Sequence, residues 1–244
     1  MVSVVINYCN NDFQFIEENI IQAKKISSDI TIVYCLQSLD GKDEDMGFLI
    51  QMMDIAIKHG CFTDEIIFEK TQTPRYHHNL MRMVGTTGTL QTHDTDYILF
   101  LDADEIIEGD KMAKYLESEH HKNFHVIAFE CYWYFREREH RADQTEQAAV
   151  LCKKDICTPD YIFSEAERWE FLNRPHLKVS QHTKHNGEIL VHHYSWVRTK
   201  EQMLNKVRSW GHKNDRDWVA EVEHEFSHDF NGTDFVHHYT YSHT

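Results

Sequence analysis

The chain has 244 residues, of which 41% are hydrophobic and 12% aromatic. This composition supports a sizeable core and excludes a disordered chain. The 40 acidic residues outnumber the 25 basic ones and give a net charge of −15 at pH 7, which disfavours a surface built to hold a nucleic-acid backbone.

No apolar run approaches the ~18 residues that a membrane-spanning helix requires. The first residues lack a charged leader and a small-residue cleavage site, so we expect a soluble, cytoplasmic protein. The six cysteines are widely spread and form no Cys-x-x-Cys motif. We therefore expect reduced, buried thiols.

Strand and helix signals alternate along the first hundred residues. A continuous apolar run over residues 2–8 predicts a buried strand, and Asn11 or Asp12 can cap a helix over 13–25. The pattern then continues with a strand at 29–36, a helix at 48–56 closed by Gly60, a strand at 65–69, a helix at 75–90 and a strand at 97–101. This βαβαβαβ alternation predicts an α/β fold with a mainly parallel sheet flanked by helices.

The pattern is less regular after residue 110. A helix at 110–120 and a strand-like segment at 124–135 are followed by a polar stretch. Thr199 and Gln202 then form a capping-box sequence that begins an amphipathic helix. Because no repeat or linker is visible, we expect a single domain over 1–244, with a regular half at 1–110 and a more irregular half at 111–244.

Three acidic residues, Asp102, Asp104 and Glu105, directly follow the apolar strand at 97–101. Ligands of open α/β sheets bind beyond the carboxyl ends of the strands. Alternate strand residues share a face, so Asp102 and Asp104 could jointly bind a hard divalent cation. The alternative is a solvated acidic turn in which Asp104 caps the next helix.

The segment Thr95-Asp-Tyr-Ile-Leu-Phe-Leu-Asp-Ala-Asp-Glu105 resembles the DxD segment of family 2-like GT-A glycosyltransferases. The strand that ends at Asn7-Tyr8 and the helix that contains His78-Asn79 resemble the nucleotide-binding half of that family over about 1–110, with His78-Asn79 in place of its Arg-Asn pair. The resemblance implies metal-dependent transfer of a sugar from a nucleotide-diphosphate donor, with a UDP-sugar expected, to a hydroxyl acceptor, with a glycan expected. Mn²⁺ or Mg²⁺ would be the cofactor.

A second segment, His192-His193-Tyr-Ser-Trp196-Val-Arg198, is similar to segments of bacterial and viral GT-A-like proteins. In many metal-dependent members a late histidine completes the coordination begun by the DxD. The resemblance therefore implies that His193, or failing that His192, joins Asp102 and Asp104 at the cation, for which imidazole is an acceptable ligand. The alternative is one histidine at a strand edge and one packed on Trp196.

The resemblance also assigns roles to the two aspartates, and strand ends offer further candidate contacts of the donor. Asp104 would bind the metal directly, and Asp102 would bind the metal or the donor ribose. Asn7, Tyr8 and Asp40 at early strand ends, together with Asn79, are candidate nucleotide-sugar contacts, with ordinary loop capping as the alternative for the first three.

Basic residues suited to the diphosphate are Arg75, Arg82, Arg198 and Lys206. Arg198 ranks first because it lies nearest the histidine motif. An inverting enzyme also needs a carboxylate that takes the acceptor proton, and Glu167 or Glu165 lies where the family has a Glu-Asp pair before a helix. The alternative is that both favour the dipole of a helix's first turn.

Two other function classes remain open. A haloacid-dehalogenase-like phosphohydrolase also places Asp-x-Asp after an apolar strand, and a non-catalytic sugar- or partner-binding scaffold could keep the fold without turnover. The acceptor would be read by loops at about 130–180, and a glycan, a lipid-linked sugar and a protein all remain open. A modified DNA base is disfavoured by the charge, although Arg136, Arg138 and Arg141 could face a phosphate. The sequence does not indicate an oligomeric state.

Overall fold

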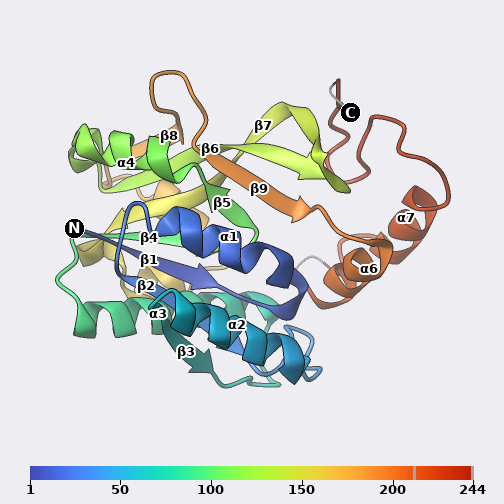
Figure 1. Cartoon of the computed structure of the whole chain (residues 1–244), viewed down its shortest axis with the longest axis horizontal. Helices are drawn as coiled ribbons and strands as arrows, with labels where there is room; N and C mark the ends of the chain where they lie inside the picture. The colour runs from blue at the N-terminus through green and yellow to red at the C-terminus, as the bar shows by residue number, and fades with distance from the viewer. Residues whose placement is uncertain (211–212, 243–244) are drawn as a thin grey trace.

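The computed structural model describes residues 1–210 and 213–242. A single sheet runs through it in the order β3-β2-β1-β4-β7-β6-β9-β5, with β8 beside β6 (Figure 1). The strands are β1 Val2–Asn7, β2 Ile30–Cys35, β3 Phe62–Ile66, β4 Tyr97–Asp102, β5 Glu105–Ile107, β6 Val126–Phe135, β7 Glu137–Lys153, β8 Val179–Thr183 and β9 Val191–Trp196. The helices are α1 Phe13–Ala23, α2 Met46–Lys58, α3 Pro74–Thr92, α4 Gly109–Glu117, α5 Pro159–Ile162, α6 Lys200–Ser209 and α7 Trp218–Glu225.

The first four strands form a continuous parallel part of the sheet, because β1 pairs in parallel with β2 and β4, and β2 with β3. Strand β6 also pairs in parallel with β8 and β9. Alternate residues of these strands enter two different cores. Val4 and Ile6 of β1 pack in the core that contains residues of α1 and α2, whereas Val5 packs in the core that contains Met81 of α3. Helices therefore cover both faces, which confirms the predicted α/β architecture.

Helix α3 lies unusually close to the sheet at Gly85. A Cβ atom at this position would lie 2.5 Å from Cγ1 of Val5 and 2.8 Å from Cγ2 of Val33. The helix begins at Thr73, whose side chain accepts a hydrogen bond from the backbone N–H of Tyr76, and Pro74 occupies the first turn. Together these features fix α3, and with it His78, against the ends of β1 and β4.

Two strand predictions need correction. The third strand is Phe62–Ile66 rather than 65–69, and Ile67 is 82% exposed. This strand forms the edge of the sheet, so its polar residues face water and the strand lacks a continuous apolar pattern. The polar stretch after residue 135 is part of the long strand β7, which pairs antiparallel with β6 and β4.

The C-terminal helices pack around tryptophans. Trp196 at the end of β9 is 1% exposed and lies in a cluster with Met203 and Val207 of α6 and Trp218 of α7. The capping box predicted for α6 is present. All six cysteines are free thiols, and four of them are buried. None of the helices within residues 1–210 and 213–242 is long and apolar enough to cross a membrane.

Candidate functional site

A cavity of about 1390 Å³ opens beyond the carboxyl ends of β1, β2 and β4. Its walls come from both halves of the chain, since they include the loops after β1 and β2, the turn after β4, the segment 165–169, the end of β9 and one face of α6. Predicted site residues that line it are Asn7, Tyr8, Asp40, Arg75, Asp102, Asp104, Glu165, Glu167, His193, Arg198 and Lys206. Asn79 and His192 are not among the lining residues.

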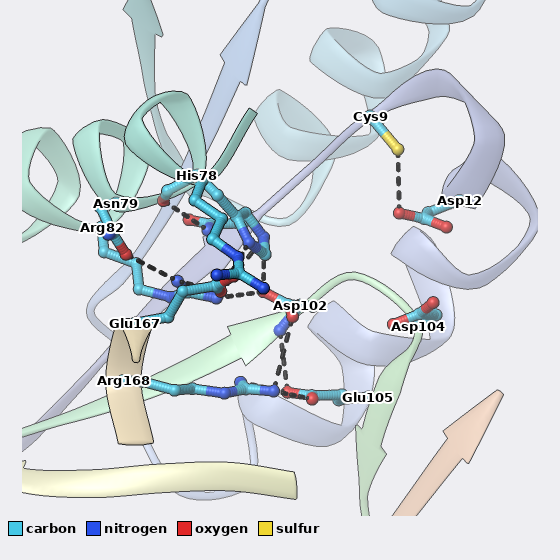
Figure 2. A network of polar contacts seen from close by, with 12 residues as sticks. Cys9, Asp12, His78, Asn79, Arg82, Asp102, Asp104, Glu105, Glu167 and Arg168 are labelled. Carbon is cyan, nitrogen blue, oxygen red and sulfur yellow. Dashed lines mark hydrogen bonds and ion pairs between the residues drawn. The ribbon is translucent and has the colours of Figure 1, made fainter. Parts of the chain in front are cut away.

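Asp102 ends β4 and lies among three cations (Figure 2). Its Oδ1 lies 3.2 Å from His78 Nε2 and 3.2 Å from Arg82 Nη2, and its Oδ2 lies 3.5 Å from Arg168 Nη2. Burial raises the pKa of Asp102, but Arg168, His78 and Arg82 outweigh it and hold this pKa well below its usual range. Arg168 also forms a bidentate pair with the buried carboxylate of Glu105.

His78 is held between two carboxylates. Its Nδ1 lies 3.1 Å from Glu167 Oε2, while its Nε2 faces Asp102. Burial and Arg82 lower the pKa of His78, but Asp102 and Glu167 outweigh them and raise it to about 9. His78 is therefore a cation at neutral pH.

Asp104 contacts a different set of cations, on the side of the site toward Asp12 (Figure 2). Arg198 Nη2 donates to its Oδ2 at 2.9 Å, and Lys206 Nζ lies 4.0 Å from the same oxygen. The expectation that Asp102 and Asp104 share a strand face was wrong, because β4 ends at Asp102 and Asp104 belongs to the following turn. Both carboxylates nevertheless border the same cavity.

Asp12 is a site residue that the sequence did not identify as one. It occupies the N-cap position of α1, but its side chain makes no capping hydrogen bond, contrary to expectation. Its carboxylate instead accepts hydrogen bonds from Arg198 Nη2 and from Cys9 Sγ. Arg198 is thus bracketed by Asp12 and Asp104, and its side chain is only 1% exposed.

Of the three predicted metal ligands, Asp104 and His193 are the pair that could hold a divalent cation between them. Asp104 Oδ1 and His193 Nε2 lie 3.7 Å apart, too far for a hydrogen bond. No three His, Cys, Asp or Glu side chains within residues 1–210 and 213–242 gather as a metal-binding group, so phosphate and water would supply the remaining ligands, as is usual for Mg²⁺. Asp102 fits less well, because both of its oxygens already face cations.

The two histidines of the late motif project to opposite sides of β9. His193 lines the cavity, with its ring 5.2 Å from that of Trp133. His192 instead lies 2.6 Å from the hydroxyl of Tyr134 and 3.0 Å from Glu108 Oε1. Of the two histidines considered as metal ligands, only His193 lies beside Asp104.

The predicted nucleotide contacts are unequally placed. Asn7 lines the cavity, with its Nδ2 donating to the carbonyl of His78 and its Oδ1 buried. Tyr8 also lines the cavity, and burial raises its pKa. Asp40 is engaged within its own turn by Ser38 and Lys42. The Nδ2 of Asn79 donates to the carbonyl of Ser164, and its Oδ1 accepts from Arg82, so the structure does not bring this side chain to the cavity.

The two candidate bases differ in how tightly neighbouring cations hold their carboxylates. Glu167 is held by His78 and Arg82, each at 3.1 Å; burial raises its pKa, but these cations outweigh it and hold the pKa far below its usual range. The side chain of Glu165 is 83% exposed and lies 3.5 Å from Arg75 Nη1. Glu165 is the freer of the two to approach an acceptor.

Glu44 is a second carboxyl that the sequence did not reveal. It lies in the loop after β2 and lines the cavity. Burial raises its pKa to about 7, with Asp12, Asp40 and Asp45 adding to the effect. The sequence does not reveal this carboxyl, because Asp12, one of the acidic residues that raise its pKa, lies 32 positions away and follows a different strand.

The three arginines considered for a phosphate of a DNA acceptor all contact other side chains of the protein. Arg136 pairs with Glu225, Arg138 pairs with Glu18, and Arg141 stacks over the ring of Tyr132. They lie along the β6–β7 hairpin and none of them lines the cavity. The structure therefore does not favour a nucleic-acid acceptor at this place.

No protein-family model matches the sequence, and neither does any curated protein. Solved structures match in fold. The structure of S. aureus TarS aligns over 94% of this chain with a TM-score of 0.50 and 11% identity, and this chain spans 44% of the length of that chain.

Two other solved structures are similar at lower TM-scores. S. aureus TarS 1-349 in complex with UDP aligns over 93% of this chain and 72% of that one, with a TM-score of 0.49 and 14% identity. A putative glucose-1-phosphate thymidylyltransferase from Bacillus anthracis aligns over 75% and 87%, with a TM-score of 0.42 and 11% identity. At such identities the likeness concerns the fold alone, and the fold is a GT-A-like, Rossmann-like α/β arrangement.

Proposed function

We propose that the protein is a metal-dependent glycosyltransferase that moves a sugar from a nucleotide-diphosphate donor, a UDP-sugar in the first instance, to a hydroxyl of a glycan acceptor. The observation that carries this proposal is the position of Asp104 Oδ1 and His193 Nε2. These atoms lie 3.7 Å apart in the large cavity at the carboxyl ends of the parallel strands. Small-molecule pockets typically measure about 300–1,000 Å³, so this cavity has room for donor and acceptor together.

Different residues of the chain would bind the metal, contact the nucleoside and orient the donor. Asp104 and His193 would hold Mn²⁺ or Mg²⁺, which when bound stabilises the charge on a leaving diphosphate. Asn7 and Tyr8 at the end of β1 would contact the nucleoside. Asp102, fixed by His78, Arg82 and Arg168, is placed to accept hydrogen bonds from a donor ribose or sugar, and thereby to orient the donor.

The acceptor proton requires a carboxylate that can move. Glu165 is the better candidate because the two cations that hold Glu167 make its carboxylate a weak base. Both residues line the cavity. Exchange of Glu165 for Gln should reduce sugar transfer while UDP binding is kept.

The alternative of an aspartate nucleophile has less support. In a phosphohydrolase of the haloacid dehalogenase type Asp102 would attack phosphorus, yet here its carboxylate faces three cations that hold its pKa well below the usual range. Such a carboxylate is a poor nucleophile. A scaffold without turnover is separated from an enzyme by the experiment below.

The test is release of UDP from UDP-sugars in the presence of MnCl₂, with and without glycan acceptors. We expect UDP release by the unaltered protein and a loss of at least about 10–100-fold in Asp104→Asn and His193→Gln, because that is the range for removing a residue that only supports a metal ligand. Glu108→Gln is a matched control, because Glu108 contacts His192 on the other side of β9.

Two results would contradict the proposal. Binding of UDP-sugars with no release of UDP under any condition would indicate a binding scaffold. Release of phosphate from simple monoesters by a protein that does not bind nucleotide-sugars would indicate a phosphohydrolase.

A further inference from the structure

The cations around the cavity differ in how fully the protein itself neutralises them. Arg82 contacts Asp102 and Glu167, Arg168 contacts Glu105 and Asp102, and Arg198 contacts Asp12 and Asp104. Their side chains are only 3%, 6% and 1% exposed, respectively. Each of these guanidiniums is therefore bracketed by two carboxylates and has little charge or surface left for a ligand.

Lys206 is placed differently. Among the contacts of residues 1–210 and 213–242, the carboxylate nearest its ammonium is Asp104, whose Oδ2 lies 4.0 Å away, beyond hydrogen-bond distance. Asp104 Oδ2 already accepts the hydrogen bond from Arg198. The side chain of Lys206 is 16% exposed and lines the cavity. Its ammonium thus acts on Asp104 and Asp12 through space, without a hydrogen bond to either, and it borders the space a ligand would fill.

The fold holds this ammonium in place. Lys206 lies on α6, whose capping box fixes the start of the helix and whose Met203 and Val207 are buried in the tryptophan cluster. The ammonium lies 5.8 Å from the ring centre of Trp196 and 5.9 Å from that of Trp210. These contacts leave the helix little freedom to turn, so the Lys206 side chain stays directed at the cavity.

We propose that Lys206, rather than Arg198, binds the diphosphate of the nucleotide donor. This inference rests on the proposed function and revises the ranking that sequence proximity gave to Arg198. An ammonium is a compact charge with three donors and suits phosphate oxygens of varied geometry. Together with a cation at Asp104 and His193, Lys206 would offset the negative charge of the diphosphate from two sides.

The experiment measures binding of UDP and of uridine by calorimetry, in MnCl₂ and in EDTA, to the unaltered protein and to Lys206→Met. Methionine keeps an apolar stem and removes the charge. We expect UDP affinity to fall about tenfold or more in both conditions, as for loss of one charge-assisted hydrogen bond, while uridine affinity stays the same. Arg208→Met is the matched control, since Arg208 is exposed on the same helix and is not among the lining residues.

A second variant guards against misfolding. Lys206→Arg keeps the charge and should recover most of the UDP affinity, whereas a merely structural role of Lys206 would lower UDP and uridine affinity together. Equal UDP affinity in Lys206→Met and the unaltered protein would overturn the inference. Failure of the unaltered protein to bind either ligand would instead contradict the proposed function, so the two failures are distinguishable.

Discussion

At the scale of single residues, the site is a set of carboxylates sorted by the cations they contact. Asp102 is fixed by His78, Arg82 and Arg168, whereas Asp104 is fixed by Arg198 and has one oxygen directed at His193. A carboxylate committed to cations orients a substrate, and one with a free oxygen can bind a metal. The two aspartates of one short motif therefore have different expected roles.

Glu44 gives a pH-dependent prediction at this scale. Its pKa in the folded protein is about 7, against an ordinary value of 4.5. The folded state therefore binds this proton more tightly than the unfolded state, and Glu44 costs stability progressively as pH rises from 4.5 to 7. We expect Glu44→Gln to raise the melting temperature at pH 8.5 by about 2–4 °C, as for roughly 1 kcal/mol in a chain of this size, with a smaller change at pH 5.

The control for that measurement is Glu139→Gln, because Glu139 is exposed on β7. Its melting temperature should differ from that of the unaltered protein by a similar amount at both pH values. A Glu44→Gln protein that is no more stabilised at pH 8.5 than at pH 5 would show that the Glu44 carboxylate is well solvated.

At the scale of elements, sequence periodicity predicted the strands whose own residues are buried. Strands β1, β2 and β4 are buried on both faces, and their continuous apolar runs gave their positions within one or two residues. Strand β7 was missed because its first half lies in a hairpin with exposed polar residues, and its pairing partner, not its own pattern, makes it a strand.

The close approach of α3 to the sheet is an element-scale feature that can be tested. A Cβ at Gly85 would meet Val5 at 2.5 Å, a contact with a stiff side chain in a packed core. We expect Gly85→Ala to lower the free energy of unfolding by about 1–3 kcal/mol in chemical denaturation.

Thr87→Ala, at an exposed position of the same helix, should change the free energy of unfolding by no more than about 0.5 kcal/mol. An equal effect of the two substitutions would mean that α3 does not depend on the glycine for its packing.

At the scale of the whole molecule, the cavity depends on contacts that a sequence cannot reveal. Asp12 and Arg198 are 186 residues apart, and Asp104 and Arg198 are 94 apart. The motif around Asp102 and Asp104 located the strand end, but the cations that contact these residues come from α3, the segment 165–169, the loop between β9 and α6, and α6 itself. The prediction of the fold therefore went further than the prediction of the site.

The charge of the molecule also bears on its substrates. The chain carries a net charge of −15, and the arginines of the β6–β7 hairpin are paired or stacked within the chain. The cavity is lined by acidic as well as basic residues, among them Asp102, Asp104, Arg198 and Lys206. A polyanionic acceptor is therefore disfavoured at the surface, and a diphosphate in the cavity would depend on the proposed metal ion and on Lys206 to offset its charge.

The most direct test of the central claim is anomalous diffraction from crystals grown with MnCl₂ and UDP. We predict a manganese peak bound by Asp104 Oδ1 and His193 Nε2, with the diphosphate of UDP on the metal and close to Lys206. A manganese ion bound elsewhere, or UDP outside the cavity at the ends of β1 and β4, would contradict the assignment of this site.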